Sequence, residues 1–252
     1  MRGHTPDSLL ALHDAGYREV AARLGPGVVV DVGCGVGEQT VRLTAPDRRV
    51  IGIDSSAATA AAAAATDPDL TTAAMDGGRL GLADASADYI CSSHIIEHFT
   101  APERHVAELA RVLRPDGTAL VLTPNEPADF ENPFHVYLFT ATTLRSMLAV
   151  FFEHVEVVGI EGDELFQADF AKRRAAGERI LKLDPFNLRK KIPPKLYVAA
   201  YEHLLPQVYK LLGKDTTGIG SGIEESNLFV TDQINDTTPV LLAIASGPRR
   251  PA

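Results

Sequence analysis

Short apolar runs alternate with helix-like stretches along roughly the first 160 residues of the chain. Each run is apolar at consecutive positions, which is typical of a strand buried on both faces of a sheet. The alternation predicts an α/β fold, with a mainly parallel sheet that is doubly wound by helices. The predicted strands are Val28–Val32, Arg49–Ile53, Leu70–Ala74, Tyr89–Cys91, Thr118–Leu122 and His154–Ile160, with a last one at Pro239–Ala245.

The stretches between these runs carry helix signals. An alanine-rich segment follows Ser55 and Ser56, and alanine favours helix while serine favours the N-cap. Another segment has Pro102 in its first turn and stops at Arg114-Pro115-Asp116-Gly117. The predicted helices are Pro6–Leu24, Glu38–Leu43, the alanine-rich stretch to Ala65, Pro102–Leu113 and Ala141–Phe151.

The pattern changes after Gly162. Two further helices are predicted at Glu164–Leu183 and Lys195–Leu212, joined by Pro185–Pro194 and followed by a glycine-rich loop at Gly218–Gly222. The simplest interpretation is a helical insertion ahead of the last strand. A single domain over 1–252 is therefore expected, with an N-terminal helix at 1–26, a core at 27–161, an insertion or lid at 162–238 and the final strand at 239–246.

Composition and charge narrow the class of protein. The net charge of −9 disfavours a general nucleic-acid-binding protein, because phosphate backbones attract basic surfaces. No apolar run reaches the roughly 20 residues that cross a bilayer, and Met1–Gly16 lacks the apolar core of a signal peptide. Cys34 and Cys91 lie far apart and give neither a zinc pattern nor a disulfide framework. A cytoplasmic protein without a transmembrane segment is expected.

A glycine-rich segment, Asp31-Val32-Gly33-Cys34-Gly35-Val36-Gly37, ends the first predicted strand. Glycines there let the backbone turn tightly and approach a ligand, and the N–H groups of a following helix can point at that ligand. A dinucleotide fingerprint would need glycine at position 38 or 40, where Glu38 and Thr40 stand. A phosphate-binding loop ending in Gly-Lys-Ser/Thr is also absent. Both nucleotide-phosphate interpretations are therefore disfavoured.

The segment resembles the first motif of the class I S-adenosylmethionine-dependent methyltransferases, (Asp/Glu)-x-Gly-x-Gly-x-Gly, which Asp31, Gly33, Gly35 and Gly37 match. Acidic residues after the second and third strands, Asp54 and Asp76, also match this family, and the likeness extends in order to about residue 160. The resemblance implies a Rossmann-like sheet of seven strands, the last antiparallel, with the helical insertion between strands six and seven.

The resemblance also implies S-adenosylmethionine as cofactor. Asp31 is expected to orient its methionine end, Asp54 to accept hydrogen bonds from the ribose, and Asp76 to lie near the adenine. The full set of expected cofactor-binding residues is Asp31, Gly33, Cys34, Gly35, Gly37, Asp54, Ser55, Met75, Asp76, Gly77, Ser92 and Ser93.

Three histidines, His94, His98 and His135, follow the fourth and fifth strands and are candidate catalytic residues. The segment Asn132–His135, followed by Phe139-Thr140, is similar to one in methyltransferases of glycan and small-metabolite pathways. We therefore expect O-methylation of such an acceptor, with His135 as the first choice of base and His98 as the second. An amine acceptor, or a non-catalytic cofactor-binding subunit, is the alternative.

The acceptor itself is described only by class. Nine lysines and arginines but three acids lie between Phe166 and Lys195, which indicates either a solvated helix face or attraction of an anionic or lipid-linked acceptor. Asp129, Glu131 and Asn132 lie near one another, but surface loops are often acidic, and no metal site is predicted. A small-molecule or glycan-like acceptor is the expected partner, and a homodimer is compatible with the sequence.

Overall fold

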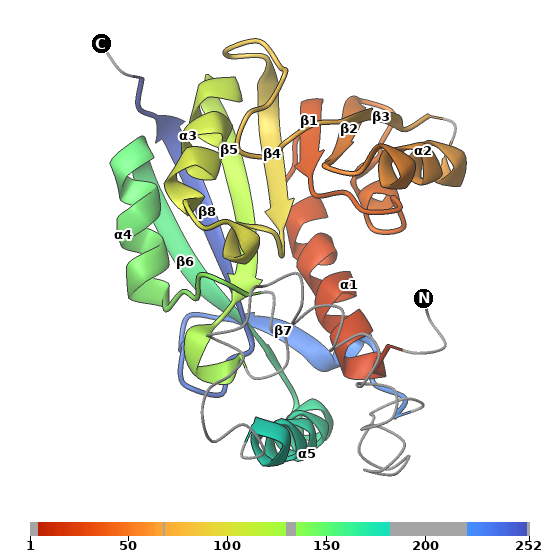
Figure 1. Ribbon diagram of the computed structural model, residues 1–252, viewed down its shortest axis with the longest axis vertical. Coiled ribbons are helices and arrows are strands. Elements are labelled where there is room, and N and C mark those ends of the chain that lie inside the picture. The colour runs from red at the N-terminus through yellow and green to blue at the C-terminus, as the bar shows by residue number, and fades with distance from the viewer. Residues whose placement is uncertain (1–4, 68, 130–134, 182–220, 251–252) are drawn as a thin grey trace.

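The structure, a computed structural model, describes residues 5–67, 69–129, 135–181 and 221–250. One mixed sheet of eight strands forms its centre, in the order β3-β2-β1-β4-β5-β8-β6-β7 (Figure 1). The strands are β1 (Gly27–Val32), β2 (Arg48–Asp54), β3 (Thr71–Ala74), β4 (Ala87–Ser93), β5 (Leu113–Pro124), β6 (Phe152–Gly162), β7 (Leu228–Thr231) and β8 (Val240–Pro248). The helices are α1 (Asp7–Ala21), α2 (Ala57–Thr66), α3 (Pro102–Val112), α4 (Ala141–Phe151) and α5 (Glu164–Leu181).

Strands β1 to β5 are parallel, and β8 pairs antiparallel with both β5 and β6. The predicted doubly wound α/β class and the antiparallel last strand are thus confirmed. Because β1 to β5 run in one direction, the loops that follow them meet at one edge of the sheet, the usual place for a ligand in such folds.

The sheet has one strand more than the seven that were predicted. Strand β7 pairs antiparallel with the end of β6 and lies within the segment 162–238, which was expected to be helical. Its four residues form too short a run to give a strand signal, and pairing with Gly159–Gly162 defines it. Of the two predicted inserted helices, α5 is present, while Pro185–Pro194 and Lys195–Leu212 lie outside the described residues. The lid role of this segment stays a prediction.

The helix predicted at Glu38–Leu43 is instead a single 3₁₀ turn, Thr40–Leu43. The two segments end at the same residue and differ at the start, where the Thr40 hydroxyl donates to Asp31 at 2.6 Å. The expected helix N-terminus facing a ligand is therefore missing after the glycine loop. Backbone N–H groups of the loop itself remain as the donors near that point.

Two apolar clusters cover the two faces of the sheet. Along β5, Leu120 and Leu122 belong to one cluster and Ala119 and Val121 to the other, as the alternation of a strand requires. Helix α1 packs on the first face, and α3 and α4 pack on the second. Figure 1 shows α1 continuing past the ends of the central strands, next to β7 and α5. This position brings the N-terminal helix to the edge where the loops meet.

A buried carboxylate joins α1 to the sheet. Asp31 is fully buried and accepts hydrogen bonds from the Tyr17 hydroxyl at 3.1 and 3.2 Å and from the Thr40 hydroxyl at 2.6 Å. Burial raises the pKa of Asp31 from 3.8 to about 6, and hydrogen bonds from Thr40, Cys91 and Tyr17 limit the rise. One charged group thus fixes the helix, the strand and the loop after it.

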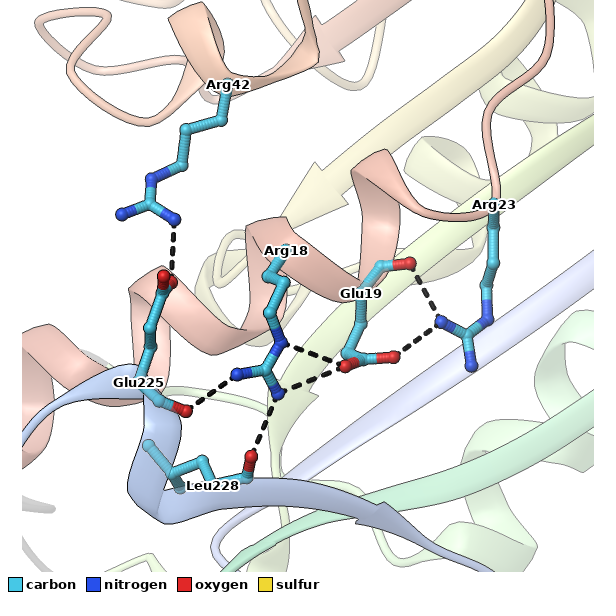
Figure 2. Close-up of polar contacts among 6 residues, drawn as sticks. All are labelled: Arg18, Glu19, Arg23, Arg42, Glu225 and Leu228. Carbon is cyan, nitrogen blue, oxygen red and sulfur yellow. Dashed lines mark hydrogen bonds and ion pairs between the residues drawn. The ribbon is translucent and has the colours of Figure 1, made fainter.

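A second set of polar contacts holds the other side of α1 (Figure 2). Arg18 donates to the backbone carbonyls of Glu225 at 2.7 Å and Leu228 at 2.9 Å, and pairs with Glu19 at 3.1 Å. Arg42 reaches the Glu225 carboxylate at 2.7 Å. The returning segment that leads into β7 is thereby tied to the N-terminal helix.

We predict that Arg18→Ala lowers the free energy of unfolding by about 1–2 kcal/mol, because two backbone carbonyls lose a charged donor. Arg23→Ala is the control, since among the described residues the Arg23 side chain bonds only to the nearby Glu19, and the change should cost under about 0.5 kcal/mol. Urea unfolding of both variants measures the difference. Equal losses would show that the contacts to β7 contribute nothing specific.

The raised pKa of Asp31 predicts a pH dependence of stability. A carboxyl whose pKa is raised by folding favours the folded state below pH 4, and this contribution is lost as the pH rises through about 6. Asp31→Asn cannot ionise, so its free energy of unfolding relative to the native protein should rise by up to about 3 kcal/mol between pH 4 and pH 7. Urea unfolding at both pH values tests this, with the exposed Asp116→Asn as control. A difference that does not change with pH would contradict the raised pKa.

Candidate functional site

The glycine loop after β1 has the conformation that its sequence requires. Gly33, Gly35 and Gly37 have φ values of +88°, +55° and +83°, a region that other residues rarely adopt. The amides of Gly33 and Cys34 both donate to the Ile53 carbonyl, at 2.7 and 2.9 Å. A Cβ on Gly33 would lie 2.3 Å from Ile95, whereas a Cβ on Gly35 meets no described atom within 4 Å. The loop therefore packs tightly at its start and is open at Gly35.

Asp54, at the end of β2, faces this open part of the loop. One carboxylate oxygen accepts from the Gly35 amide at 3.2 Å, and the other accepts from the Ser56 amide at 2.9 Å. An ionised carboxylate has about four acceptor sites, so capacity remains for a ligand that offers hydroxyl groups. Ser55 beside it is exposed. Cys34 is buried with its thiol near the Gly35 carbonyl, and burial raises its pKa to about 12, which keeps it protonated.

The loop after β3 carries the next expected residues. Met75 is half-buried and donates its amide to the Asp54 carbonyl at 2.9 Å, which places the two loops side by side. Asp76 is exposed, and one of its carboxylate oxygens accepts from the Gly78 amide at 2.8 Å. Asp54 and Asp76 thus stand on neighbouring loops at the same edge of the sheet.

A buried histidine that sequence reasoning missed fixes this arrangement. His105 of α3 contacts the Gly77 carbonyl at 2.8 Å through Nδ1 and the Ser92 hydroxyl at 2.9 Å through Nε2, and its ring stacks on Phe99. Burial lowers its pKa to about 4, so the ring is neutral and donates from Nδ1. The Ser92 side chain, expected to bind the cofactor, is wholly buried against this ring.

Several buried polar atoms follow β4 with no hydrogen-bond partner among the described residues. They are Ser93 Oγ, His94 Nε2 and Glu97 Oε1. His94 adopts a positive φ of 54°, which turns the chain sharply at the end of the strand. Buried polar atoms are almost always paired in native proteins, so a row of unpaired ones at this edge indicates a place for a ligand.

The buried carboxylate of Glu97 lies at the centre of the histidine candidates. Its Oε2 accepts from the Thr123 hydroxyl at 3.1 Å, and its Oε1 lies 3.6 Å from His94 Nδ1 and 3.9 Å from His135 Nε2. Burial works to raise the pKa of Glu97, but His94 and the charge of His135 outweigh it and lower the pKa. Glu97 is therefore ionised at neutral pH.

His135 is oriented by Asp129, whose carboxylate contacts Nδ1 at 2.9 Å. A carboxylate accepts only, so Nδ1 donates to Asp129, and Nε2 lies on the side of Glu97. The amides of Val136 and Tyr137 donate to the Glu97 carbonyl at 2.9 and 3.1 Å, which holds this loop against the end of β4. Glu131 and Asn132 lie outside the described residues.

The structure brings the three predicted histidines together. The exposed His98 has its ring centroid 5.2 Å from that of His135, and one ligand atom each of Glu97, His98 and His135 lies within 4.8 Å of the others. His13 of α1 also reaches this place, with its ring centroid 4.5 Å from that of His94. Burial, followed by the charge of His94, lowers the pKa of His13 to about 3.

Four contributors were missed from the sequence: His13, Tyr17, Glu97 and His105. His13 and Tyr17 sit in an amphipathic helix, where an aromatic ring is usually a core residue. Glu97 precedes the predicted candidate His98, but nothing in the sequence indicated that it is buried.

In the basic segment from Phe166 to Lys195, Arg173 is buried and donates to the Ser8 hydroxyl at 2.7 Å, so this positive charge has a structural role. The segment beyond residue 181 lies outside the described residues.

No helix in the described part of the chain is long and apolar enough to span a membrane.

Comparison with known proteins agrees with this geometry. A profile of the family described as a methyltransferase domain matches residues 30–121. A probable S-adenosylmethionine-dependent methyltransferase of Mycolicibacterium smegmatis is 34% identical over 155 residues, which cover 59% of this chain and 60% of that protein. A trans-aconitate 2-methyltransferase of Deinococcus radiodurans is 37% identical over 116 residues, which cover 45% of this chain and 43% of that protein. The chain thus spans about 60% or less of the length of these relatives.

A solved structure supports the fold over nearly the whole chain. It is that of a possible histamine N-methyltransferase of Thermotoga maritima, with a TM-score of 0.60 and 16% identity, and the match covers 94% of this chain and 90% of that one. At this level of identity the likeness concerns the fold alone. A methyltransferase domain therefore covers residues 30–121, and the sheet order and the glycine loop with its two acidic partners agree with the resemblance of the chain to the class I S-adenosylmethionine-dependent methyltransferases.

Proposed function

We propose that this protein transfers the methyl group of S-adenosylmethionine to a hydroxyl oxygen of a glycan-like or small-metabolite acceptor. The observation that carries the proposal is the position of His135. Asp129 holds the ring so that Nε2 faces Glu97, at the same edge of the sheet as the cofactor loop. An imidazole oriented by a carboxylate, beside the cofactor loop, is the arrangement that activation of a hydroxyl needs.

The cofactor would lie across the loops after β1, β2 and β3. The open face of Gly35 allows its approach, the free acceptor sites of Asp54 suit the two ribose hydroxyls, and the exposed Asp76 suits the adenine amino group. Asp31 is fully engaged with Tyr17 and Thr40, so we propose that it acts on the methionine end by shaping the loop.

The chemistry is an in-line displacement. The acceptor oxygen attacks the methyl carbon, the carbon–sulfur bond breaks with its electron pair left on sulfur, and S-adenosylhomocysteine is released. The hydroxyl proton passes to Nε2 of His135, and Asp129 stabilises the imidazolium that forms. The protein's own contribution is to orient the two reactants and to remove this proton.

The relatives are named for different kinds of acceptor and do not identify the one used here. We propose the class of acceptor from the chemistry of the site. One relative is named for methylating trans-aconitate, which supports an oxygen-rich acceptor, although it matches less than half of this chain. The Thermotoga structure carries the name of a possible histamine N-methyltransferase and supports only the fold. An amine acceptor is therefore an outcome of the tests below.

We predict that Asp54→Ala weakens S-adenosylmethionine binding at least about tenfold, because two charge-assisted hydrogen bonds to the ribose are lost. Isothermal titration measures the affinity, and the exposed Asp116→Ala should bind as the native chain does. Titration with NAD should show no binding. If Asp54→Ala keeps the native affinity, the proposed cofactor position is wrong.

We predict that His135→Ala lowers turnover of a hydroxyl acceptor about 100-fold or more while changing cofactor affinity less than about twofold. Acceptors come from a panel of sugars, sugar acids and hydroxy acids, with histamine and phosphoethanolamine as amines, and formation of S-adenosylhomocysteine is the readout. The exposed His154→Ala is the control. Turnover of an amine that survives His135→Ala would overturn the oxygen assignment.

A further inference from the structure

The carboxylate of Glu97 has an environment that the methyl-transfer scheme leaves unexplained. The residue is fully buried, and its Oε1 has no hydrogen-bond partner among the described residues. The nearest histidine nitrogens, His94 Nδ1 at 3.6 Å and His135 Nε2 at 3.9 Å, lie beyond hydrogen-bond distance. A buried anionic oxygen without a donor is costly. Something of opposite charge fits between these groups.

The groups around Oε1 form a set of metal ligands. Glu97 offers a carboxylate oxygen, and His98 and His135 each offer an imidazole nitrogen, all within 4.8 Å of one another. Two ligand atoms bound tetrahedrally at about 2.1 Å from a cation lie about 3.4 Å apart. The 3.9 Å between His135 Nε2 and Glu97 Oε1 is close to that value, so small side-chain rotations would complete the site.

The surroundings of His135 are those of a metal-bound histidine. Its Nδ1 is held by the Asp129 carboxylate, which fixes the ring and makes Nε2 more basic. The Glu97 carboxylate accepts a hydrogen bond from the Thr123 hydroxyl, and the Glu97 backbone carbonyl accepts from the amides of Val136 and Tyr137. Two of the three ligands are therefore positioned before any ion arrives.

We propose that Glu97, His98 and His135 bind one divalent first-row transition cation, with open coordination positions toward the acceptor. Two imidazoles and one carboxylate suit manganese, iron, cobalt or zinc, whereas magnesium and calcium prefer sites made of oxygen alone. No metal site was predicted from the sequence, because acids such as Asp129 are common in surface loops. In the structure Asp129 is a hydrogen-bond partner of His135 and not one of the proposed ligands.

The role of the cation rests on the proposed function. An acceptor hydroxyl bound to it has a lowered pKa and loses its proton to water, so that the oxygen attacks the methyl group as the anion. In this scheme the cation takes over from His135 the activation of the hydroxyl, while the methyl transfer to oxygen proposed above is kept. The two schemes differ in a property that can be measured, namely whether methyl transfer survives removal of metal.

The test begins with metal binding by the tag-free chain after treatment with EDTA. Titration with Mn²⁺, followed by calorimetry and by electron paramagnetic resonance, should show one site per chain. Glu97→Gln and His135→Gln should abolish it, and Asp129→Asn should weaken it about 10- to 100-fold. The exposed His154→Gln should bind as the native chain does. Absence of binding with both Mn²⁺ and Zn²⁺, or binding that survives Glu97→Gln and His135→Gln, would overturn the proposal.

Two further measurements tell failure of the metal site apart from misfolding of a variant and from failure of the proposed methyl transfer. Mn²⁺ should raise the thermal unfolding midpoint of the native chain and leave that of Glu97→Gln unchanged, while both bind S-adenosylmethionine equally. With an acceptor in hand, EDTA should abolish methyl transfer and Mn²⁺ should restore it. Full activity in EDTA would overturn the catalytic role of the cation but leave methyl transfer intact. Loss of S-adenosylmethionine binding by the native chain would instead refute the proposed function.

Discussion

The buried carboxylate of Asp31 is the constraint on which the rest of the site depends. Its two oxygens are bound by Tyr17 from α1 and by Thr40 from the turn after the glycine loop, so one group joins three segments. Burial makes its ionisation costly, and these donors offset the cost. With the helix, the strand and the turn held together, the glycines between them adopt the positive φ angles that leave the loop open at Gly35.

Glu97 is the second buried carboxylate of the candidate site. It lies in the 3₁₀ turn Ile96–His98 that follows β4, and it accepts a hydrogen bond from Thr123 of β5. The difference lies in its partners: both oxygens of Asp31 are satisfied by the protein, whereas one oxygen of Glu97 is left without a donor among the described residues. A satisfied carboxylate supports the fold, and an unsatisfied one beside two imidazoles is suited to bind a ligand.

The cofactor loops lie in the part of the chain that matches its relatives, whereas the loop with Asp129 and His135 lies beyond the family profile. The family profile covers residues 30–121, which contain the cofactor loops and Glu97 with His98, and stops before Asp129 and His135. The curated relatives likewise match only part of the chain. Function in a shared fold is set by its loops and insertions, and the segment from β5 to α4, which holds Asp129 and His135, lies outside the part of the chain that the family profile matches.

The sequence by itself determined the α/β class, the parallel strands, the glycine loop and the acidic residues at the ends of β2 and β3. These features are local: apolar runs report burial, and glycine spacing reports backbone conformation. The tertiary structure alone decided that Tyr17 binds Asp31, that His105 locks Ser92, and that His135 faces Glu97. It also decided that β7 joins the sheet and that the turn after Gly37 is 3₁₀. Such contacts join residues far apart in the chain, and they depend on how helices pack against the sheet, which no local pattern encodes.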